Sequence, residues 1–365
     1  MKVIFINRGI SFYRGGGENF DLNIALSLKN LGCEIEFITG KSLVGSIKYP
    51  VEDFKTIYLT SPYLRDLSQK IKKGSGYINL LDRKIFASKV LDYLKRINET
   101  VVLQVCSIPE IVEIKRYKNF PVVIFFPGPP WKGDYEKIKL FDKVITHGDT
   151  LNFIKENIRK DAIDIPPGVD TEVFKKMKSN IREKYKLEEK KVLIFTGRLV
   201  PIKNISFLIQ SMKKLSSEYV LLIVGDGPMK NALKKEVEKE KLNEKIIFTG
   251  YIPQSQLPFY YSSADIFVFS SFYDNFPNSV LEAMACELPI IAPSVGGIPM
   301  IIENGINGYL YNPGNIEEFI EKVEFFIKNN NLREKTGKTN RKKIIKNYNW
   351  MESAKKLKTV YEKIL

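Results

Sequence analysis

Short apolar segments alternate with helical patterns along nearly the whole of this 365-residue chain, and this alternation most limits its fold. The segments are rich in β-branched residues, which is typical of buried parallel strands joined by helices. They lie at 2–7, 34–39, 101–105, 122–126 and 143–147, and again at 191–197, 219–225, 246–250, 265–270, 289–293 and 308–311. The pattern predicts an α/β fold with two Rossmann-like halves.

One segment interrupts the alternation near the middle of the chain. The stretch Ile165-Pro166-Pro167-Gly168-Val169-Asp170 precedes a polar, lysine-rich region, which is typical of a linker. We therefore expect two domains joined near residue 170. Ligands of open parallel sheets bind beyond the carboxyl ends of the strands, so the expected site is the cleft between the two domains.

The formal net charge of +15 has two interpretations. A basic chain attracts the phosphates of nucleotides, nucleic acids or anionic membranes, whereas a surface dense in lysine and glutamate gives a similar surplus without a partner. Basic and acidic residues alternate at 236–241, which favours the second interpretation for most of the charge. The basic residues are dispersed and form no known binding module, so we expect no nucleic-acid partner.

Residues 62–96 combine basic and apolar side chains in an amphipathic pattern. A helix here could lie on an anionic membrane, or it could pack on the sheet with a solvated basic face, which is more frequent. No apolar run is long enough to span a membrane, the first residues resemble a strand rather than a signal peptide, and three scattered cysteines indicate reduced thiols. We expect a cytoplasmic protein, with the inner face of the membrane as the alternative location.

Two carboxylates flank a predicted helix start in the second half. Asp274 follows the apolar segment that ends near residue 270, and Glu282 lies in the helix that follows. Pro277 suits the first helical position, with Asp274 or Asn275 as the N-cap. The free N–H groups of such a helix start favour anionic or hydroxyl-rich ligands.

Glycine turns follow three other strands. The loop Arg14-Gly15-Gly16-Gly17-Glu18 suits a phosphate or a simple tight turn, but it lacks the spacing of a dinucleotide fingerprint, which disfavours nicotinamide chemistry. Gly197-Arg198 with Lys203 supplies two cations that could neutralise a diphosphate without a metal, unless this is a solvent-exposed basic loop. The acid in Gly225-Asp226-Gly227 could serve only as a helix cap.

Taken together, these motifs resemble the GT4 family of retaining, nucleotide-sugar-dependent glycosyltransferases (glycosyl transferases group 1). The resemblance is dense in the second half, and the motifs that carry it are Gly197-Arg198 with Lys203, Gly225-Asp226-Gly227-Pro228, Gly250-Tyr251-Ile252, Asp274 with Glu282-Ala283-Met284, Val295-Gly296-Gly297-Ile298-Pro299 and 304–310. It extends more thinly to the glycine loop at 15–17, the linker and Tyr348-Asn349-Trp350. It implies a GT-B fold whose last helix returns to the first domain, which gives an acceptor-side domain at 1–170 plus 347–365 and a donor-binding domain at 171–346.

The resemblance also assigns roles at the site. Arg198 and Lys203 would hold the donor diphosphate, Glu282 the ribose hydroxyls and Asp274 the sugar hydroxyls. The other donor-binding positions would be Gly16, Gly17, Gly197, Asp226, Tyr251, Ile252, Asn275, Phe276, Pro277, Asn278 and Ser279. The partners implied are a nucleotide sugar and a glycan, lipid-linked or small-molecule acceptor, with neither cofactor nor metal.

The chain departs from the family pattern at two places. Aspartate replaces the commoner glutamate at Asp274, and Pro127-Gly128-Pro129-Pro130 stands where many relatives have a histidine. Glu18 and His147 are the acceptor-side candidates, although a lone histidine at a strand end is more often structural. The expected activity is transfer of a sugar to an acceptor hydroxyl with retention. The alternatives are a GT-B epimerase or phosphorylase, or a non-catalytic subunit of a glycosylation complex.

Overall fold

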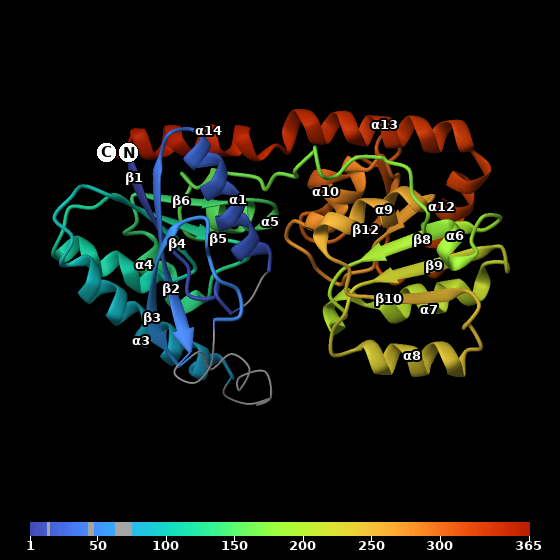
Figure 1. The fold of residues 1–365 in the computed structure, drawn as a ribbon, viewed down its shortest axis with the longest axis horizontal. Helices are drawn as coiled ribbons and strands as arrows, with labels where there is room; N and C mark the ends of the chain where they lie inside the picture. The colour runs from blue at the N-terminus through green and yellow to red at the C-terminus, as the bar shows by residue number, and fades with distance from the viewer. Residues whose placement is uncertain (13–14, 43–46, 63–74) are drawn as a thin grey trace. The chain divides into compact units, whose positions relative to one another are not determined.

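The structure is a computed structural model, and it describes residues 1–12, 15–42, 47–62 and 75–365 (Figure 1). The chain divides into two compact units. Unit 1 comprises Met1–Pro167 with Trp350–Leu365, and unit 2 comprises Gly168–Asn349. The sequence had placed the two boundaries after residues 170 and 346, within a few residues of this division.

Unit 1 contains a seven-stranded parallel sheet with the order β3-β2-β1-β4-β5-β6-β7. The strands are β1 (Lys2–Ile6), β2 (Glu34–Ser42), β3 (Lys55–Ser61), β4 (Val102–Cys106), β5 (Val122–Phe126), β6 (Lys143–Thr146) and β7 (Ile163–Asp164). The sequence analysis missed the two edge strands. β3 is only half-buried over most of its length and β7 has two residues, so neither gives a continuous apolar run.

Both faces of this sheet are covered, which explains the unbroken apolar pattern of its strands. Val3 and Phe5 of β1 point to one face and Ile4 and Ile6 to the other. The elements around the sheet are α1 (Gly16–Asn30), α3 (Ser75–Leu94), η1 (Pro109–Arg116), η2 (Lys132–Asp134), α4 (Tyr135–Ile138), α5 (Asp149–Asn157) and α14 (Trp350–Glu362). The first face packs on α1 and α14, and the second on α3 and η1.

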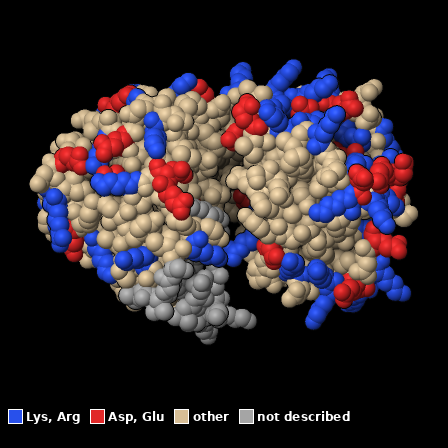
Figure 2. Space-filling view, in the orientation of Figure 1, with Lys and Arg blue, Asp and Glu red and all other residues tan. Residues whose placement is uncertain are grey.

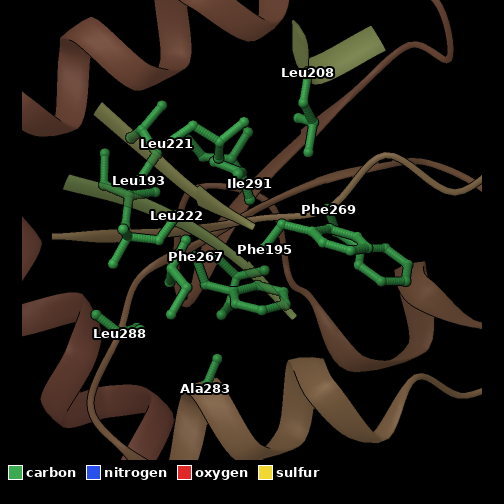
Figure 3. Packing of buried hydrophobic residues seen from close by; sticks show 14 of the residues in the cluster. Leu193, Phe195, Leu208, Leu221, Leu222, Phe267, Phe269, Ala283, Leu288 and Ile291 are labelled. Atoms are coloured by element: carbon green, nitrogen blue, oxygen red, sulfur yellow. The ribbon is translucent and has the colours of Figure 1, made fainter. Parts of the chain in front are cut away.

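Unit 2 contains a six-stranded parallel sheet with the order β10-β9-β8-β11-β12-β13. Its strands are β8 (Lys191–Thr196), β9 (Tyr219–Val224), β10 (Ile246–Gly250), β11 (Ile266–Val268), β12 (Ile290–Pro293) and β13 (Gly308–Tyr311). The sheet places Leu193, Phe195, Phe267 and Ile291 together in its core (Figure 3). All six strands were predicted from the sequence.

The helices of unit 2 lie between and around these strands. They are α6 (Ile181–Tyr185), η3 (Pro201–Lys203), α7 (Ile205–Lys214), α8 (Lys230–Lys239), η4 (Gln254–Gln256), α9 (Leu257–Ser263), α10 (Asn278–Ala285), α11 (Ile298–Ile301), α12 (Ile316–Lys328) and α13 (Asn330–Asn347). The chain then re-enters unit 1 through α14. The last helix therefore belongs to unit 1, as the resemblance implied.

Each sheet has one point at which the strand order reverses. In unit 1 it lies between β1 and β4, and in unit 2 between β8 and β11. At such a point the loops leave adjacent strands in opposite directions and open a crevice at the carboxyl edge. The fold therefore marks one candidate ligand edge in each unit.

The membrane hypothesis for residues 62–96 gains little from the described part of this segment. Residues 63–74, like Arg14 of the glycine loop, lie outside the described residues. In α3, Arg83 is not part of a basic outer face, because its guanidinium contacts Glu110 at 2.8 Å and Asp134 at 2.7 Å. Among the described helices, none combines the length and apolar character that a membrane span needs.

Candidate functional site

The predicted donor residues gather at the carboxyl edge of the unit 2 sheet. Backbone hydrogen bonds join the loops there: the Gly197 N–H donates to Val224 O at 3.0 Å and the Gly225 N–H to Gly250 O at 2.9 Å. The Phe272 N–H donates to Ile202 O at 2.8 Å, which connects the loop after β11 to the loop after β8. The motifs that were separate in the sequence therefore form one connected surface.

Glycine allows these loops to approach closely. A Cβ atom at Gly225 would lie 1.9 Å from the carbonyl oxygen of Gly197, a separation at which two backbones cannot coexist. Gly225 also has a positive φ of 140°, which side chains rarely adopt. Glycine at this position thus allows the turn after β9 to pack against the loop that carries Arg198.

The main cation and the first acid of the predicted site form an ion pair. Lys203 Nζ lies 2.5 Å from Asp274 Oδ2, and both side chains are about four-fifths buried. The ammonium also lies 4.9 Å from the centre of the Phe269 ring. Sequence analysis had given these residues separate partners, but here the carboxylate holds the lysine at the edge of the sheet. Arg198 is exposed at the same edge.

The predicted helix start is wrong by one residue. α10 begins at Asn278, with Pro277 as the N-cap in extended conformation and no side-chain cap. The N-cap position is therefore occupied by Pro277 and not by Asp274 or Asn275, and the Asp274 carboxylate pairs with Lys203. The fixed φ of proline suits the N-cap found here as well as the first helical position, so the sequence could not separate the two. Phe276 and Ser279 flank this start.

Glu282 accepts a hydrogen bond from a tyrosine that was not predicted from the sequence. The hydroxyl of Tyr261, on α9, donates to Glu282 Oε2 at 2.9 Å and lies 2.6 Å from Thr196 Oγ1 at the end of β8. Burial raises the pKa of Glu282 to about 7, against the lowering effect of the Tyr261 hydrogen bond. The sequence signal for Tyr261 was a pair of tyrosines at 260–261 shortly before a predicted strand. Such a pair is common in helices that pack on a sheet, so it did not indicate a contact with Glu282.

The remaining donor candidates are more exposed. Tyr251, directly after β10, is 74% exposed, and Ile252 is half-buried beside it. Asp226 accepts from the Gly227 N–H at 2.7 Å and pairs with Lys230 at 2.7 Å. The hydrogen bond from Lys230 keeps the pKa of Asp226 below its usual value. Asp226 therefore organises the turn before α8, but it is not the helix cap that the simpler interpretation predicted, because the N-cap of α8 is Met229.

A cavity of about 400 Å³ lies at the strand-order reversal of unit 1. It is lined by Asn7, Arg8, Gly9, Gly16, Gly17, Glu18, Arg83, Cys106, Ser107, Ile108 and Pro127. Three of the four predicted first-domain positions, Gly16, Gly17 and Glu18, therefore line this cavity. A Cβ atom at Gly17 would lie 3.1 Å from the Pro127 ring, whereas one at Gly16 would meet open space.

Glu18 has a local role at this cavity. Its carboxylate accepts a hydrogen bond from the Gly15 N–H at 3.1 Å and so stabilises the start of α1. The two arginines of the cavity are compensated by buried carboxylates: Arg8 lies 2.9 Å from Asp82, and Arg83 contacts Glu110 and Asp134. Arg8 and Arg83 were not predicted, since their partners lie far away in sequence.

His147 lies in the core of unit 1 and is not among the residues that line the cavity. Its ring lies 5.7 Å from that of Phe20 and 5.5 Å from that of Phe125. Burial lowers its pKa to about 4, so the imidazole is neutral near pH 7. This environment agrees with the structural interpretation of a lone histidine at a strand end.

A buried acid supports the wall of the cavity. Asn7 Nδ2 donates to Asp21 Oδ2 at 2.7 Å, and Asn7 Oδ1 accepts from the Gly9 N–H at 3.1 Å. Asp21 is fully buried on α1, and burial raises its pKa to about 8. The sequence signal for this buried acid was the position of Asp21 between Phe20 and Ile24, on the apolar face of the helix.

We expect Asp21→Asn to remove a pH dependence of stability. The unfolded chain loses the Asp21 proton near pH 4, whereas the folded chain keeps it to about pH 8. Folding therefore takes up a proton between these values, and stability falls by up to about 1.4 kcal/mol for each pH unit as the pH rises. Asparagine is neutral in both states, so the variant should gain stability relative to wild type between pH 5 and pH 8.

Urea unfolding followed by tryptophan fluorescence tests this prediction, because both tryptophans, Trp131 and Trp350, lie in unit 1. Ser27→Ala is the matched control, since Ser27 is a buried polar residue on the same helix. The control should keep the wild-type pH dependence. Parallel curves for wild type and Asp21→Asn would show that Asp21 is ionised in the folded protein.

Comparison with known proteins identifies the domain that carries the predicted donor residues. Residues 177–343 match the family model described as glycosyl transferases group 1. Residues 177–343 are a glycosyl transferases group 1 domain. This group 1 domain contains Arg198, Lys203, Asp274 and Glu282.

Curated relatives and a solved structure extend the comparison. Sulfoquinovosyl transferase SQD2 of Arabidopsis thaliana is 33% identical over 198 residues, covering 52% of this chain and 38% of the relative. An Escherichia coli UDP-Gal:alpha-D-GlcNAc-diphosphoundecaprenol alpha-1,3-galactosyltransferase is 28% identical over 207 residues, covering 54% and 53%. The chain thus matches about half or less of the length of these relatives. Anabaena Alr3699/HepE, solved in complex with UDP, superposes with a TM-score of 0.82 at 17% identity over 100% of both chains. This likeness shows that the fold is GT-B, as the sequence predicted.

Proposed function

We propose that this protein is a retaining, metal-independent glycosyltransferase that moves a sugar from a nucleoside-diphosphate sugar to an acceptor hydroxyl. The observation that carries the proposal is the connected edge of the group 1 domain, where Lys203 shares the loop after β8 with Arg198 and pairs with Asp274 on the loop before α10. Fixed cations and a helix N-terminus stabilise the negative charge that develops on a leaving diphosphate. No protein nucleophile is needed if the leaving phosphate accepts the proton of the acceptor hydroxyl.

Glu282 and Asp274 have complementary tasks in this proposal. Glu282, fixed by Tyr261, would accept hydrogen bonds from the ribose hydroxyls when ionised. Asp274 would accept from a sugar hydroxyl while still holding Lys203 against the diphosphate. Tyr251 and Ile252 lie at the end of β10, a position from which their backbone can contact the base.

UDP-sugars are the first donors to test. HepE has been solved with UDP and with UDP-glucose, and the Escherichia coli relative is named for UDP-Gal. The same relative is named for a diphosphoundecaprenol acceptor, which places a lipid-linked glycan among the acceptors to test. The cavity of unit 1 that Glu18 lines is the proposed acceptor side.

The function can be tested by thermal shift with UDP, GDP and ADP. Sugar transfer is then assayed with the corresponding nucleotide sugars in the presence of EDTA. A bound nucleotide should raise the melting temperature by mass action, and one donor class should support turnover without metal. NMR of the product should show the anomeric configuration of the donor. Absence of any nucleotide-induced shift would contradict the donor site, and turnover only with added metal would contradict the proposed chemistry.

A further inference from the structure

The positive charge of unit 2 is concentrated on one helix. Residues 168–349 contain twenty-seven lysines and arginines and twenty-one aspartates and glutamates, a surplus of six positive charges. α13 alone contains seven basic residues and one acid, which is also a surplus of six. The rest of unit 2 is therefore balanced, so a general abundance of lysine does not explain this helix.

One face of α13 is fixed against the body of unit 2. Its buried residues are Thr336, Gly337, Asn340 and Ile344. A Cβ atom at Gly337 would lie 2.0 Å from the carbonyl oxygen of Glu287, which shows how closely the helix approaches the end of α10. Asn340 Nδ2 also donates to Leu288 O at 2.7 Å. The opposite face of α13 is thereby held outward.

Three of the seven cations have partners inside unit 2. Arg333 lies 3.6 Å from Asp265, and Arg341 donates to the backbone carbonyls of Phe174 and Thr171. Lys343 donates to Ile301 O at 2.8 Å, and burial lowers its pKa. These three cations contribute to the packing of the helix.

The other four cations form a single exposed row, which we name the lysine stripe. It consists of Lys335, Lys338, Lys342 and Lys346. Spacings of three and four residues keep the row within about 80° of arc, nearly opposite the buried face, over about 16 Å of helix. The described parts of the chain provide no ion pair to any of the four. Figure 2 shows the blue side chains gathered along the edge formed by α13.

The chemistry of this face fits a lipid surface better than a nucleic acid. Ile345 flanks the lysine stripe and is 49% exposed, so an apolar side chain lies beside the charges. The exposed positions of α13 include neither arginine nor an aromatic residue, the groups that bind phosphates in a fixed fork or stack on bases. Lysines with flexible stems near an anionic bilayer each add to binding, in a salt-dependent manner.

We propose that the lysine stripe of α13 docks this protein on an anionic lipid bilayer. The proposal does not depend on the glycosyltransferase function. It differs from the alternative considered from the sequence, in which a helix within residues 62–96 would lie on the membrane. It also explains why the whole charge surplus of unit 2 lies on a helix outside the donor site.

Co-sedimentation with vesicles tests the docking surface. The wild-type chain should bind vesicles of phosphatidylcholine with one third phosphatidylglycerol at low salt, and should bind pure phosphatidylcholine weakly. Replacement of the four lysines of the stripe by glutamine should reduce binding by at least about tenfold. Because these side chains are exposed, the melting temperature should stay close to that of wild type.

A second quadruple variant controls for net charge. Lys234, Lys235, Lys239 and Lys241, on and just after α8, are exposed and lie in the same unit. Their replacement by glutamine removes the same charge and should leave vesicle binding near wild type. Equal losses in the two variants would overturn the proposal, as would undiminished binding by the stripe variant. Binding of duplex DNA in preference to anionic vesicles, lost with the stripe, would also overturn it.

Discussion

Replacing Lys203 by alanine is expected to lower sugar transfer by about 100- to 1000-fold, the usual effect of removing one fixed group that stabilises transition-state charge. The protein should stay folded, because Lys203 is paired with only one carboxylate at the edge of the sheet. The nucleotide-induced thermal shift should shrink as well. Arg198→Ala should have a similar effect on transfer, since it would hold the same diphosphate.

Lys213→Ala is the control for loss of an ion-paired lysine from unit 2. Lys213 lies 2.5 Å from Glu240, away from the donor edge, and its loss should leave transfer unchanged. Transfer at the wild-type rate in Lys203→Ala would show that the diphosphate lies elsewhere.

The double variant Lys203→Ala with Asp274→Asn separates two roles of Asp274. If Asp274 only holds the lysine, the double variant should transfer as slowly as Lys203→Ala, and if it also contacts the sugar, more slowly.

The strands of both sheets other than β3 and β7 could be predicted because buried parallel strands are continuous apolar runs. The glycine turns after β8, β9 and β12 were also visible, since each follows such a run. The sequence could not give the contact between Lys203 and Asp274. They are 71 residues apart, and only the packing of the loop after β11 on the loop after β8 brings them together.

In unit 1, the sequence pattern could not predict the ion-pair partners of an arginine on α3. The amphipathic pattern of α3 suggested that Arg83 lies on a basic surface. Its partners Glu110 and Asp134 lie in η1 and η2, two 3₁₀ segments with no periodic pattern long enough to predict. The cavity was therefore anticipated only on the side formed by the glycine loop. A further sequence signal for this cavity was Asp21, an acid on the apolar face of a predicted helix.

Gly296→Ala is expected to lower transfer by about 100-fold, because misplacement of reacting groups by an ångström has effects of that size. A Cβ atom at Gly296 would lie 2.2 Å from the carbonyl oxygen of Asp274, so the backbone that presents this acid would have to move. The neighbouring Gly297 N–H donates to the same oxygen at 3.0 Å. The glycine pair after β12 thus fixes the loop that positions Asp274 and, through it, Lys203.

Gly314→Ala separates displacement of Asp274 from backbone strain. Gly314 also has a positive φ, of 84°, but a Cβ atom there would meet no atom within 4 Å. Both variants should lose about 1–3 kcal/mol of stability from the left-handed conformation, and only Gly296→Ala should also lose transfer and the nucleotide-induced thermal shift. Equal transfer in the two variants would mean that the Asp274 carbonyl can move without consequence. The ion pair with Lys203 would then be a structural contact, and the donor diphosphate would have to rely on Arg198 and the start of α10.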